Sequence, residues 1–466
     1  MLIFRYFTVS FFLFSSAIAS CQYVFYVDSI YVTGNRHTKE YVVLSEMNIH
    51  PGDTINMENM QNRFEANRKL LQNTSIILDA TFIVHQLDTL HKTAQLEVNV
   101  KEAWFLYPAP IFELADRNFN VWWVEQKRSI NRINIGLKGY HTNLTGNRDR
   151  IKALYQTGYT QKMELEYSYP YLNRKKTLGV GVTFLYSSNR ELGYNTLNNA
   201  LVFYKDRDQF LLRRYRSGIG LTYRPNLIST YNFGIAYQEN YVDHYIVEQL
   251  NPQYFGNGST SQMYLGLFGR YTYDKRDIRP YPEKGFYFNI SVEKYGIGKL
   301  NDYKAFYVSP TAAVYVKFNN RLFSENNIKI QANLDRSKVP YNQNRALGYT
   351  NNYIRGYEYY VIDGTDYIYT KNNLKFKVLE KQINARWIPL RQFQVIPFKC
   401  YLTANFDVGY VVDEHYGQSN PLSNTLLTGY GLGFDIVLLY GNVLQIEYSW
   451  NGKGENGLFL HGKTNF

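Results

Sequence analysis

Residues 444–450 read Leu-Gln-Ile-Glu-Tyr-Ser-Trp, and their side chains alternate between apolar and polar at every step. A period of two is typical of a β-strand whose two faces meet different surroundings. The same alternation occurs at 163–169 and 327–334, and similar runs recur near residues 133, 178, 219, 233, 265, 286, 374 and 432. From about residue 104 onward, the sequence therefore predicts a succession of strands.

Alternation alone fits both a soluble β-sandwich and a membrane β-barrel, because each has one apolar and one polar face. The chain has 466 residues, 17% of them aromatic, and 45 tyrosines, yet its mean hydropathy is only −0.38. After the N-terminus there is no run of about 18 apolar residues, so no spanning helix is expected. Lys375 and Lys377 alternate with Leu374, Phe376 and Val378, which indicates a wet inner face.

These features, a terminal Phe466 and an N-terminal targeting segment favour a transmembrane antiparallel β-barrel over residues 104–466. At roughly 22 residues per strand and connection, the barrel would have on the order of 16 strands. The net charge of +12 suits contact with anionic lipid head groups. A nucleic-acid partner is not expected, because Lys and Arg do not cluster on a recognisable binding module.

Residues 1–20 are predicted to be a signal peptide, with Arg5 before an apolar core that runs from Phe7 to Ala19. Two cleavages are open. Ala17-Ile18-Ala19 fits an A-x-A site, whereas Ile18-Ala19-Ser20-Cys21 fits a lipobox that would leave Cys21 lipidated. Since Cys400 is the only other cysteine and lies far away in a strand-like segment, a disulfide framework is not expected.

Residues 22–102 are predicted to form one small α/β domain with the order βααββ. A strand at 26–33 ends in the Gly34-Asn35 turn, and Thr38 is expected to cap the first helix. Two further strands are expected at 75–85 and 93–101. The second helix should carry its apolar stripe on Met57, Met60, Phe64 and Leu71.

Inside an irregular stretch rich in Tyr and Asn, residues 353–357 read Tyr-Ile-Arg-Gly-Tyr. They resemble the signature loop of the BamA/TamA-type outer-membrane assembly superfamily, the bacterial surface antigen family. The resemblance implies that a loop around residues 340–370 folds back into the barrel and that its Arg docks on an acidic residue of the inner wall. The βααββ unit with Val-Thr-Gly-Asn-Arg at 32–36 resembles a POTRA domain, the periplasmic module of this superfamily, which binds extended chains by adding a strand to a sheet edge.

Three further segments resemble the family. Residues 273–285 resemble its mid-barrel hairpin, although the same residues fit a well-formed hairpin without further role; the motif residues are Asp274, Arg276, Asp277, Pro282 and Gly285. Asn143-Leu144-Thr145-Gly146 resembles a family turn that precedes Tyr169-Pro170-Tyr171. Phe466 resembles the terminal aromatic assembly signal of outer-membrane barrels, with Thr464 where a more apolar residue is common.

A guanidinium inside a barrel needs a carboxylate to offset its desolvation. By parity, Asp407 and Asp435 face the lumen, the latter with Gly431 and Gly433, which would give the loop room to pack, and Glu447 also faces inward. We therefore expect Arg355 to pair with Asp407, with Asp435 or with both, so that Arg355, Gly356 and Tyr357 anchor the loop. The alternative is an Arg in a solvated extracellular loop.

Pro108 and Pro110 lie near the expected first barrel strand, and proline cannot donate to a strand ladder. If they fall in the strand that closes against the last one, the seam between the two is weak. They fit a linker equally well.

No enzyme and no cofactor are predicted. Gly429-x-Gly431-x-Gly433 follows no strand-to-helix transition, and no G-x-S-x-G run occurs. His85 and His91 have no ligand partners at metal spacing, so no metal site is expected.

The resemblance implies a protein of the bacterial outer membrane, with its N-terminal domain in the periplasm, that inserts other barrel proteins or translocates clients. Implied partners are unfolded outer-membrane or secreted clients, membrane lipids and accessory periplasmic or lipoprotein partners. Two alternatives stay open: a passive channel or docking scaffold without insertase activity, and export of lipid or a surface polymer.

Overall fold

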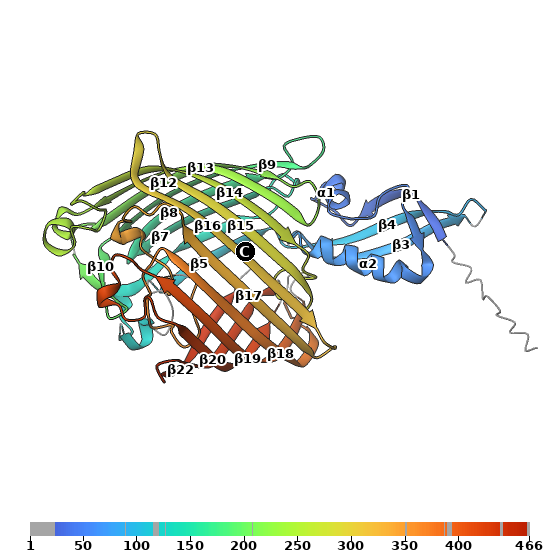
Figure 1. Ribbon diagram of the computed structural model, residues 1–466. Helices are drawn as coiled ribbons and strands as arrows, with labels where there is room; N and C mark the ends of the chain where they lie inside the picture. Colours follow the sequence, from blue (N-terminus) through green and yellow to red (C-terminus); the bar gives the residue numbers. More distant parts are fainter. Residues whose placement is uncertain are drawn as a thin grey trace, which may run out of the picture.

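A computed structural model describes residues 24–463 except 89, 115–120, 126, 207, 350–351, 386, 389–393 and 439–440. It shows a small N-terminal domain beside one end of a large, curved β-sheet (Figure 1). The predicted signal peptide, the possible lipidation site Cys21 and the terminal Phe466 lie outside the described residues.

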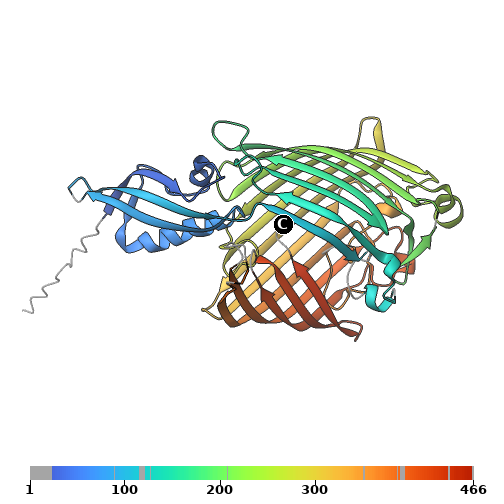
Figure 2. The ribbon, with the colours of Figure 1, turned by 180° about the vertical axis from the view of Figure 1, so that it is seen from behind.

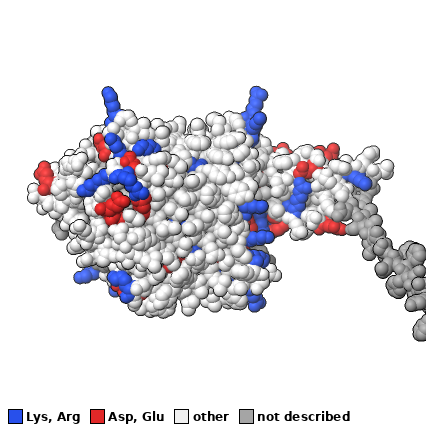
Figure 3. Space-filling view, in the orientation of Figure 1, with Lys and Arg blue, Asp and Glu red and all other residues white. Residues whose placement is uncertain are grey.

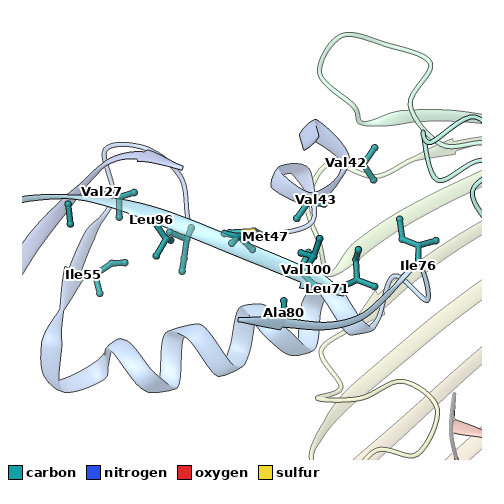
Figure 4. Close-up of a cluster of buried hydrophobic side chains, with 14 of the residues drawn as sticks. Val27, Val42, Val43, Met47, Ile55, Leu71, Ile76, Ala80, Leu96 and Val100 are labelled. Atoms are coloured by element: carbon teal, nitrogen blue, oxygen red, sulfur yellow. The ribbon is translucent and has the colours of Figure 1, made fainter. Parts of the chain in front are cut away.

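The N-terminal domain packs two helices on a four-stranded sheet of order β2-β1-β4-β3. Apolar side chains of both layers, among them Val27, Met47, Leu71 and Leu96, are buried between them (Figure 4). The predicted βααββ order is confirmed, with one short extra strand, β2, before the second helix. The elements are β1 (Val24–Thr33), α1 (Glu40–Ser45), β2 (Thr54–Asn56), α2 (Met57–Gln72), β3 (Ile77–Asp88) and β4 (Thr93–Glu102).

Two local predictions in this domain are wrong. The residue that caps α1 is Lys39, without a side-chain hydrogen bond, rather than Thr38. Thr38 instead accepts a hydrogen bond from Asn143 of the barrel. Met57 is 42% exposed because it begins α2, before the helix reaches the sheet, whereas Leu71 at the other end is fully buried.

Sixteen strands form the large sheet, and each pairs antiparallel with its neighbour, which confirms the predicted barrel class and strand number. The β10–β11 hairpin stands apart from it. Its strands are Glu191–Leu197 and Ala200–Lys205. The barrel strands are β5 (Leu106–Leu114), β6 (Ile133–His141), β7 (Arg150–Gly158), β8 (Thr160–Tyr169), β9 (Leu178–Asn189), β12 (Leu212–Tyr223), β13 (Ser229–Val242), β14 (Ser261–Asp274), β15 (Gly285–Ile297), β16 (Leu300–Lys317), β17 (Leu322–Asn333), β18 (Asp366–Asn384), β19 (Val395–Val412), β20 (Leu427–Val437), β21 (Val443–Asn451) and β22 (Asn456–Lys463).

Short helical turns occupy Val121–Glu125, Ile130–Arg132, Ile246–Leu250, Tyr341–Gln343 and Gly417–Ser419. None of the described helices is long and apolar enough to cross a membrane.

The two faces of the barrel wall have opposite character, as the alternation predicts. On β21, Gln445, Glu447 and Ser449 are buried on the inner side, while Leu444 and Tyr448 are exposed on the outer side. The interior is therefore polar, and the apolar side chains of the wall face outward.

We call the barrel end beside the N-terminal domain the near end, and the opposite end the far end. The chain enters the barrel from β4 through β5, so the turns β6–β7, β8–β9, β12–β13 and β14–β15 lie at the near end. The segment 334–365, between β17 and β18, starts and finishes at the far end.

Strand length changes around the barrel. β18 has 19 residues and β16 and β19 have 18 each, whereas the described parts of β5 and β22 have 9 and 8 and end at residues 114 and 463, next to residues that the structure does not describe. Figure 2 shows the first and the last barrel strands from behind. Pro108 and Pro110 both lie within β5, so their placement in a linker is wrong.

Candidate functional site

Arg355 lies inside the barrel and contacts two carboxylates of the wall. Its Nη1 donates to Oδ1 of Asp407 at 2.8 Å, and its Nε donates to Oε1 of Glu447 at 3.0 Å. The backbone N–H of Arg355 also donates to Oδ2 of Asp407 at 3.2 Å. Arg355, Asp407 and Glu447 are 5%, 0% and 2% exposed, so all three charges are shielded from water. The cluster connects segment 334–365 to β19 and β21.

The loop backbone approaches the wall at glycines. Gly356 has φ of +82°, and a Cβ on it would lie 2.8 Å from the carbonyl of Trp450. A Cβ on Gly429 would lie only 1.9 Å from the carbonyl oxygen of Arg355. Asn451 Nδ2 donates to the carbonyl of Gly356 at 2.9 Å, and the N–H of Gly452 donates to the Tyr357 hydroxyl at 3.2 Å.

The expectation that Gly431 and Gly433 make room for the loop is wrong. A Cβ on either would meet neighbouring strands, namely the Tyr448 carbonyl or the Thr403 hydroxyl. Gly429 on β20 and Gly409 on β19, where a Cβ would lie 2.8 Å from the Ile354 side chain, face the loop instead.

Asp435 is buried near the other end of β20, away from Arg355. It accepts from the Tyr281 hydroxyl at 2.7 Å and from Gln445 at 3.1 Å. Tyr281 belongs to the β14–β15 connection, and three strands separate β15 from β19 in the sheet. The nearby Glu283 accepts from the Tyr401 hydroxyl at 2.9 Å. This near-end hairpin therefore contacts the inner wall at β19 and β20.

The motif residues of that hairpin shape its bend. Arg276 makes a two-pronged contact with Asp274, through Nε and Nη2 at 2.8 Å each. Oδ1 of Asp277 accepts from the N–H groups of residues 283 and 284. Pro282 is buried, and Gly285 has φ of +131° with no room for a Cβ beside the Lys275 carbonyl.

The last strand contacts the same inner loop. The His461 ring on β22 stacks on Tyr353 with ring centres 4.8 Å apart. Its Nε2 lies 3.5 Å from Glu358 and 3.6 Å from Glu447. Phe459, two residues earlier on β22, packs on Tyr359 with ring centres 5.5 Å apart.

At the far end, the tip of the β10–β11 hairpin enters the loops. Asn199 is fully buried with φ of +60°. Its Nδ2 donates to the Val361 carbonyl at 3.1 Å, and its Oδ1 accepts from the N–H of Leu422 at 3.0 Å. The N–H of Val361 returns a bond to the Asn199 carbonyl at 2.9 Å. One side chain thereby joins three separate far-end segments.

The N-terminal domain meets the near end through a buried carboxylate. Oε1 of Glu46, directly after α1, accepts from Arg148 at 2.5 Å, from Arg224 at 2.6 Å and from the Tyr171 hydroxyl at 2.8 Å. Burial alone would raise the pKa of Glu46, but Arg148, Arg224 and the Tyr171 hydroxyl outweigh it and lower the pKa to about 2. The turn at Asn143–Gly146 adds the bond to Thr38 and a bond from the N–H of Lys39 to the Gly146 carbonyl.

Sequence reasoning missed several of these residues. Glu447 was recognisable as inward-facing by parity, but nothing marked it as a partner of Arg355. Glu46, Asn199 and His461 carry no local signal, because the partners of Glu46 and Asn199, and the loop partners of His461, lie 102 or more residues away in the chain. No cluster of three or more metal-ligating side chains occurs in the part of the chain that the structure describes.

Two family descriptions match this chain. "Surface antigen variable number repeat", the POTRA family, matches residues 25–103. "Omp85 superfamily domain" matches residues 143–456, which is more than half of the sequence. The chain belongs to the Omp85 superfamily. Members of this family are transport and assembly barrels of the bacterial outer membrane and not enzymes.

Solved structures share the fold of this Omp85 protein at low identity. BamA from Haemophilus ducreyi lacking POTRA domains 1–3 is 14% identical, with 94% of this chain and 84% of that chain covered and a TM-score of 0.52. CdiB from Escherichia coli is 11% identical over 94% and 75% of the two chains, with a TM-score of 0.56. CdiB from Acinetobacter baumannii is 10% identical over 94% and 73%, with a TM-score of 0.52. No curated protein matches the sequence.

Proposed function

We propose that this protein inserts client polypeptides into the outer membrane or translocates them across it, and that it does so through the seam between β5 and β22. The chain divides accordingly into a signal peptide (1–20), a periplasmic POTRA domain (22–102) and an outer-membrane barrel (104–466) with an inner loop around 340–370. The near end then faces the periplasm. Clients, membrane lipids and accessory periplasmic or lipoprotein partners are the proposed contacts.

The observation that carries this proposal is the open edge of the sheet. Among the described residues, β5 pairs only with β6 and β22 only with β21, so the described sheet ends in two free edges, one on β5 and one on β22. An unpaired edge is where a client strand can add by backbone hydrogen bonding.

Pro108 and Pro110 support the same seam. Both side chains are exposed on the outer face, so both positions have the same parity in β5. All nine residues of β5 keep an unbroken register with β6. Prolines in an edge strand place their missing N–H on the open side. The seam edge of β5 therefore lacks two donors, and closure against β22 is weakened.

A passive channel or docking scaffold, the alternative, does not require the seam to open. An insertase must open it, whereas a scaffold works with the seam closed. The interior contacts of Arg355 at one level and of Tyr281 near the other end fill space that a passive pore would need free.

The deciding experiment is a disulfide staple across the seam, in a Cys400→Ser background. Positions 110 and 112 of β5 would be combined with 458 and 460 of β22, all on the outer face. A matched control joins Ile219 to Ile235, which pair directly on β12 and β13 away from the seam. Quantitative outer-membrane proteomics should show clients lost with the seam staple, restored by reductant, and unaffected by the control staple. Full assembly with a closed seam would refute the insertase and favour the scaffold.

A further inference from the structure

A cavity of about 1170 Å³ lies where the N-terminal domain meets the near end of the barrel. We call it the vestibule. Its walls are α2 with the start of β3 on one side and the near-end turns on the other, and it reaches Tyr281 and Tyr401 in the barrel interior. It exceeds the roughly 300–1,000 Å³ of a typical small-molecule pocket. Its size therefore suits a segment of chain.

The barrel side of the vestibule carries four arginines, Arg148, Arg150, Arg224 and Arg279, which we call the arginine rim. Basic side chains gather at this junction in Figure 3. In the part of the chain that the structure describes, two carboxylates contact the rim: Glu46 binds Arg148 and Arg224, and Asp274 binds Arg279 at 3.0 Å. Asp274 also binds Arg276 through both of its oxygens, so these two carboxylates do not balance the four positive charges of the rim.

Two members of the rim show this imbalance directly. Arg150 lies over the Tyr140 ring at 5.0 Å, its Nε is buried without a hydrogen-bond partner, and no described carboxylate lies within ion-pair distance of it. Burial and the neighbouring Arg148, Arg224 and Arg276 lower the pKa of Arg279 despite its contact with Asp274. A guanidinium in this situation gains from an added anion, which it can bind through two parallel N–H donors.

The opposite wall has a different character. On α2, Arg68 contacts Glu65 and Asp79, so its charge is balanced. Ile77 at the start of β3 gives this wall apolar surface, and Ile278 and Pro280 of the near-end hairpin add apolar surface on the barrel side. β3 is an edge strand of its sheet, and Ile77 is its first residue. An extended chain added along β3 would therefore continue into the vestibule.

We propose that the vestibule binds an acidic segment of a client polypeptide, with the arginine rim receiving its carboxylates and the apolar wall receiving neighbouring side chains. This inference rests on the proposed function, because it names the chemistry of the client that the barrel handles. Charge complementarity favours the acidic segment, and the apolar surface beside the open strand edge favours a polypeptide over a lone phosphate group.

The test uses the full-length protein in nanodiscs of uncharged lipid and a fluorescent peptide of alternating apolar and Asp/Glu residues, read by fluorescence anisotropy. A matched peptide carries Asn and Gln in place of Asp and Glu. We expect the acidic peptide to bind at least about tenfold more tightly, with the difference shrinking between roughly 0.05 M and 0.5 M salt. Equal binding of the two peptides would overturn the proposal.

Variants assign the effect to the rim. Arg150→Gln with Arg279→Gln should remove the preference for the acidic peptide, and the Lys versions should retain part of it, because they keep charge but lose the two-pronged geometry. Arg190→Gln at the far end, where Arg190 lies over Phe210, should change nothing. Rim variants that keep the full preference would refute the assignment.

Competition with lipid vesicles distinguishes a peptide site from a lipid site. Binding to the stapled protein distinguishes failure of this inference from failure of the proposed function. If vesicles with an anionic phospholipid displace the peptide through the rim while the peptide itself shows no charge preference, the ligand is a lipid phosphate and the inference fails. Peptide binding does not need an open seam, so the stapled protein should bind normally. If the stapled protein also assembles clients, the proposed function fails and the binding result stands.

Discussion

Nη1 of Arg355 lies 2.8 Å from Oδ1 of Asp407, and neither residue is more than 5% exposed. An ion pair at the surface of a protein contributes about 0–1 kcal/mol. A buried pair behaves differently, because removal of one partner leaves an uncompensated charge away from water at a cost of about 3–5 kcal/mol. Loss of either partner should therefore destabilise the docked position of the inner loop.

We expect Arg355→Ala to release the loop, because it leaves Asp407 and Glu447 buried without their shared cation. The loop should become accessible to protease added at the far end, and client assembly should fall. Arg336→Ala is the matched control, since Arg336 lies in the same segment, pairs with Asp366 and has a half-exposed side chain. A loop that stays protected in Arg355→Ala would show that Arg355 does not anchor it.

Gly429→Ala should displace the loop without touching a charge, because the new methyl group would lie 1.9 Å from the Arg355 carbonyl oxygen. Gly139→Ala on β6 is the control, as its Cβ would meet nothing within 4 Å. Hydrogen exchange of residues 352–357 measures the effect: faster exchange is expected in Gly429→Ala alone. Identical exchange in both variants would contradict the close approach.

Glu46→Gln should loosen the N-terminal domain from the barrel by about 3 kcal/mol, because Arg148 and Arg224 lose their common anion. Spin labels at exposed positions 62 on α2 and 319 at the near end would report a broader distance distribution. Glu65→Gln, on the exposed face of α2, should leave the distribution narrow.

The same carboxylate predicts a pH dependence. The docked pKa of Glu46 is about 2 against an ordinary value of 4.5, so docking is stabilised fully above pH 4.5 and loses this contribution as the pH falls from 4.5 towards 2. The spin-label distances should broaden over that range in the wild type and be insensitive to it in Glu46→Gln. Broadening at the same pH in both would assign the transition to another group.

Asn199→Ala should open the far end, because it removes two side-chain hydrogen bonds and places alanine at a positive φ, for a cost of about 2–3 kcal/mol. Asn198→Ala, at the exposed neighbouring position, has a similar φ but no such bonds. Uptake of a large antibiotic by cells that carry each variant measures the opening. Equal uptake in the two variants would mean that residues other than Asn199 keep the far end closed.

Alternation along single strands predicted the strands and which side of the wall Asp407, Asp435 and Glu447 face, because parity depends only on neighbours in sequence. The choice of a barrel also needed the aromatic content and the targeting segment, and the strand number came from the length of the segment. It could not decide which inward carboxylate lies at the height of Arg355, since that depends on strand stagger around the whole sheet. Asp435 faces inward as predicted but lies at the level of Tyr281. Stagger also decides that Gly429 lies against the loop, whereas Gly431 lies against the neighbouring strand β21.

Helix boundaries in the N-terminal domain depend on tertiary contacts for a related reason. Thr38 is a good capping residue by propensity, but its hydroxyl accepts a bond from Asn143 of the barrel. That competing partner lies 105 residues away and leaves no trace in the local sequence.

The contacts of His461 link movement of β22 at the seam to movement of the inner loop. Its ring on β22 stacks on Tyr353, and its Nε2 lies beside Glu358 of the loop and Glu447, which also contacts Arg355. If β22 swings away from the wall, these contacts to the loop break at the same moment. Opening of the β5–β22 seam and loosening of the inner loop are then energetically coupled through His461, while Arg355 still holds the loop to β19 and β21.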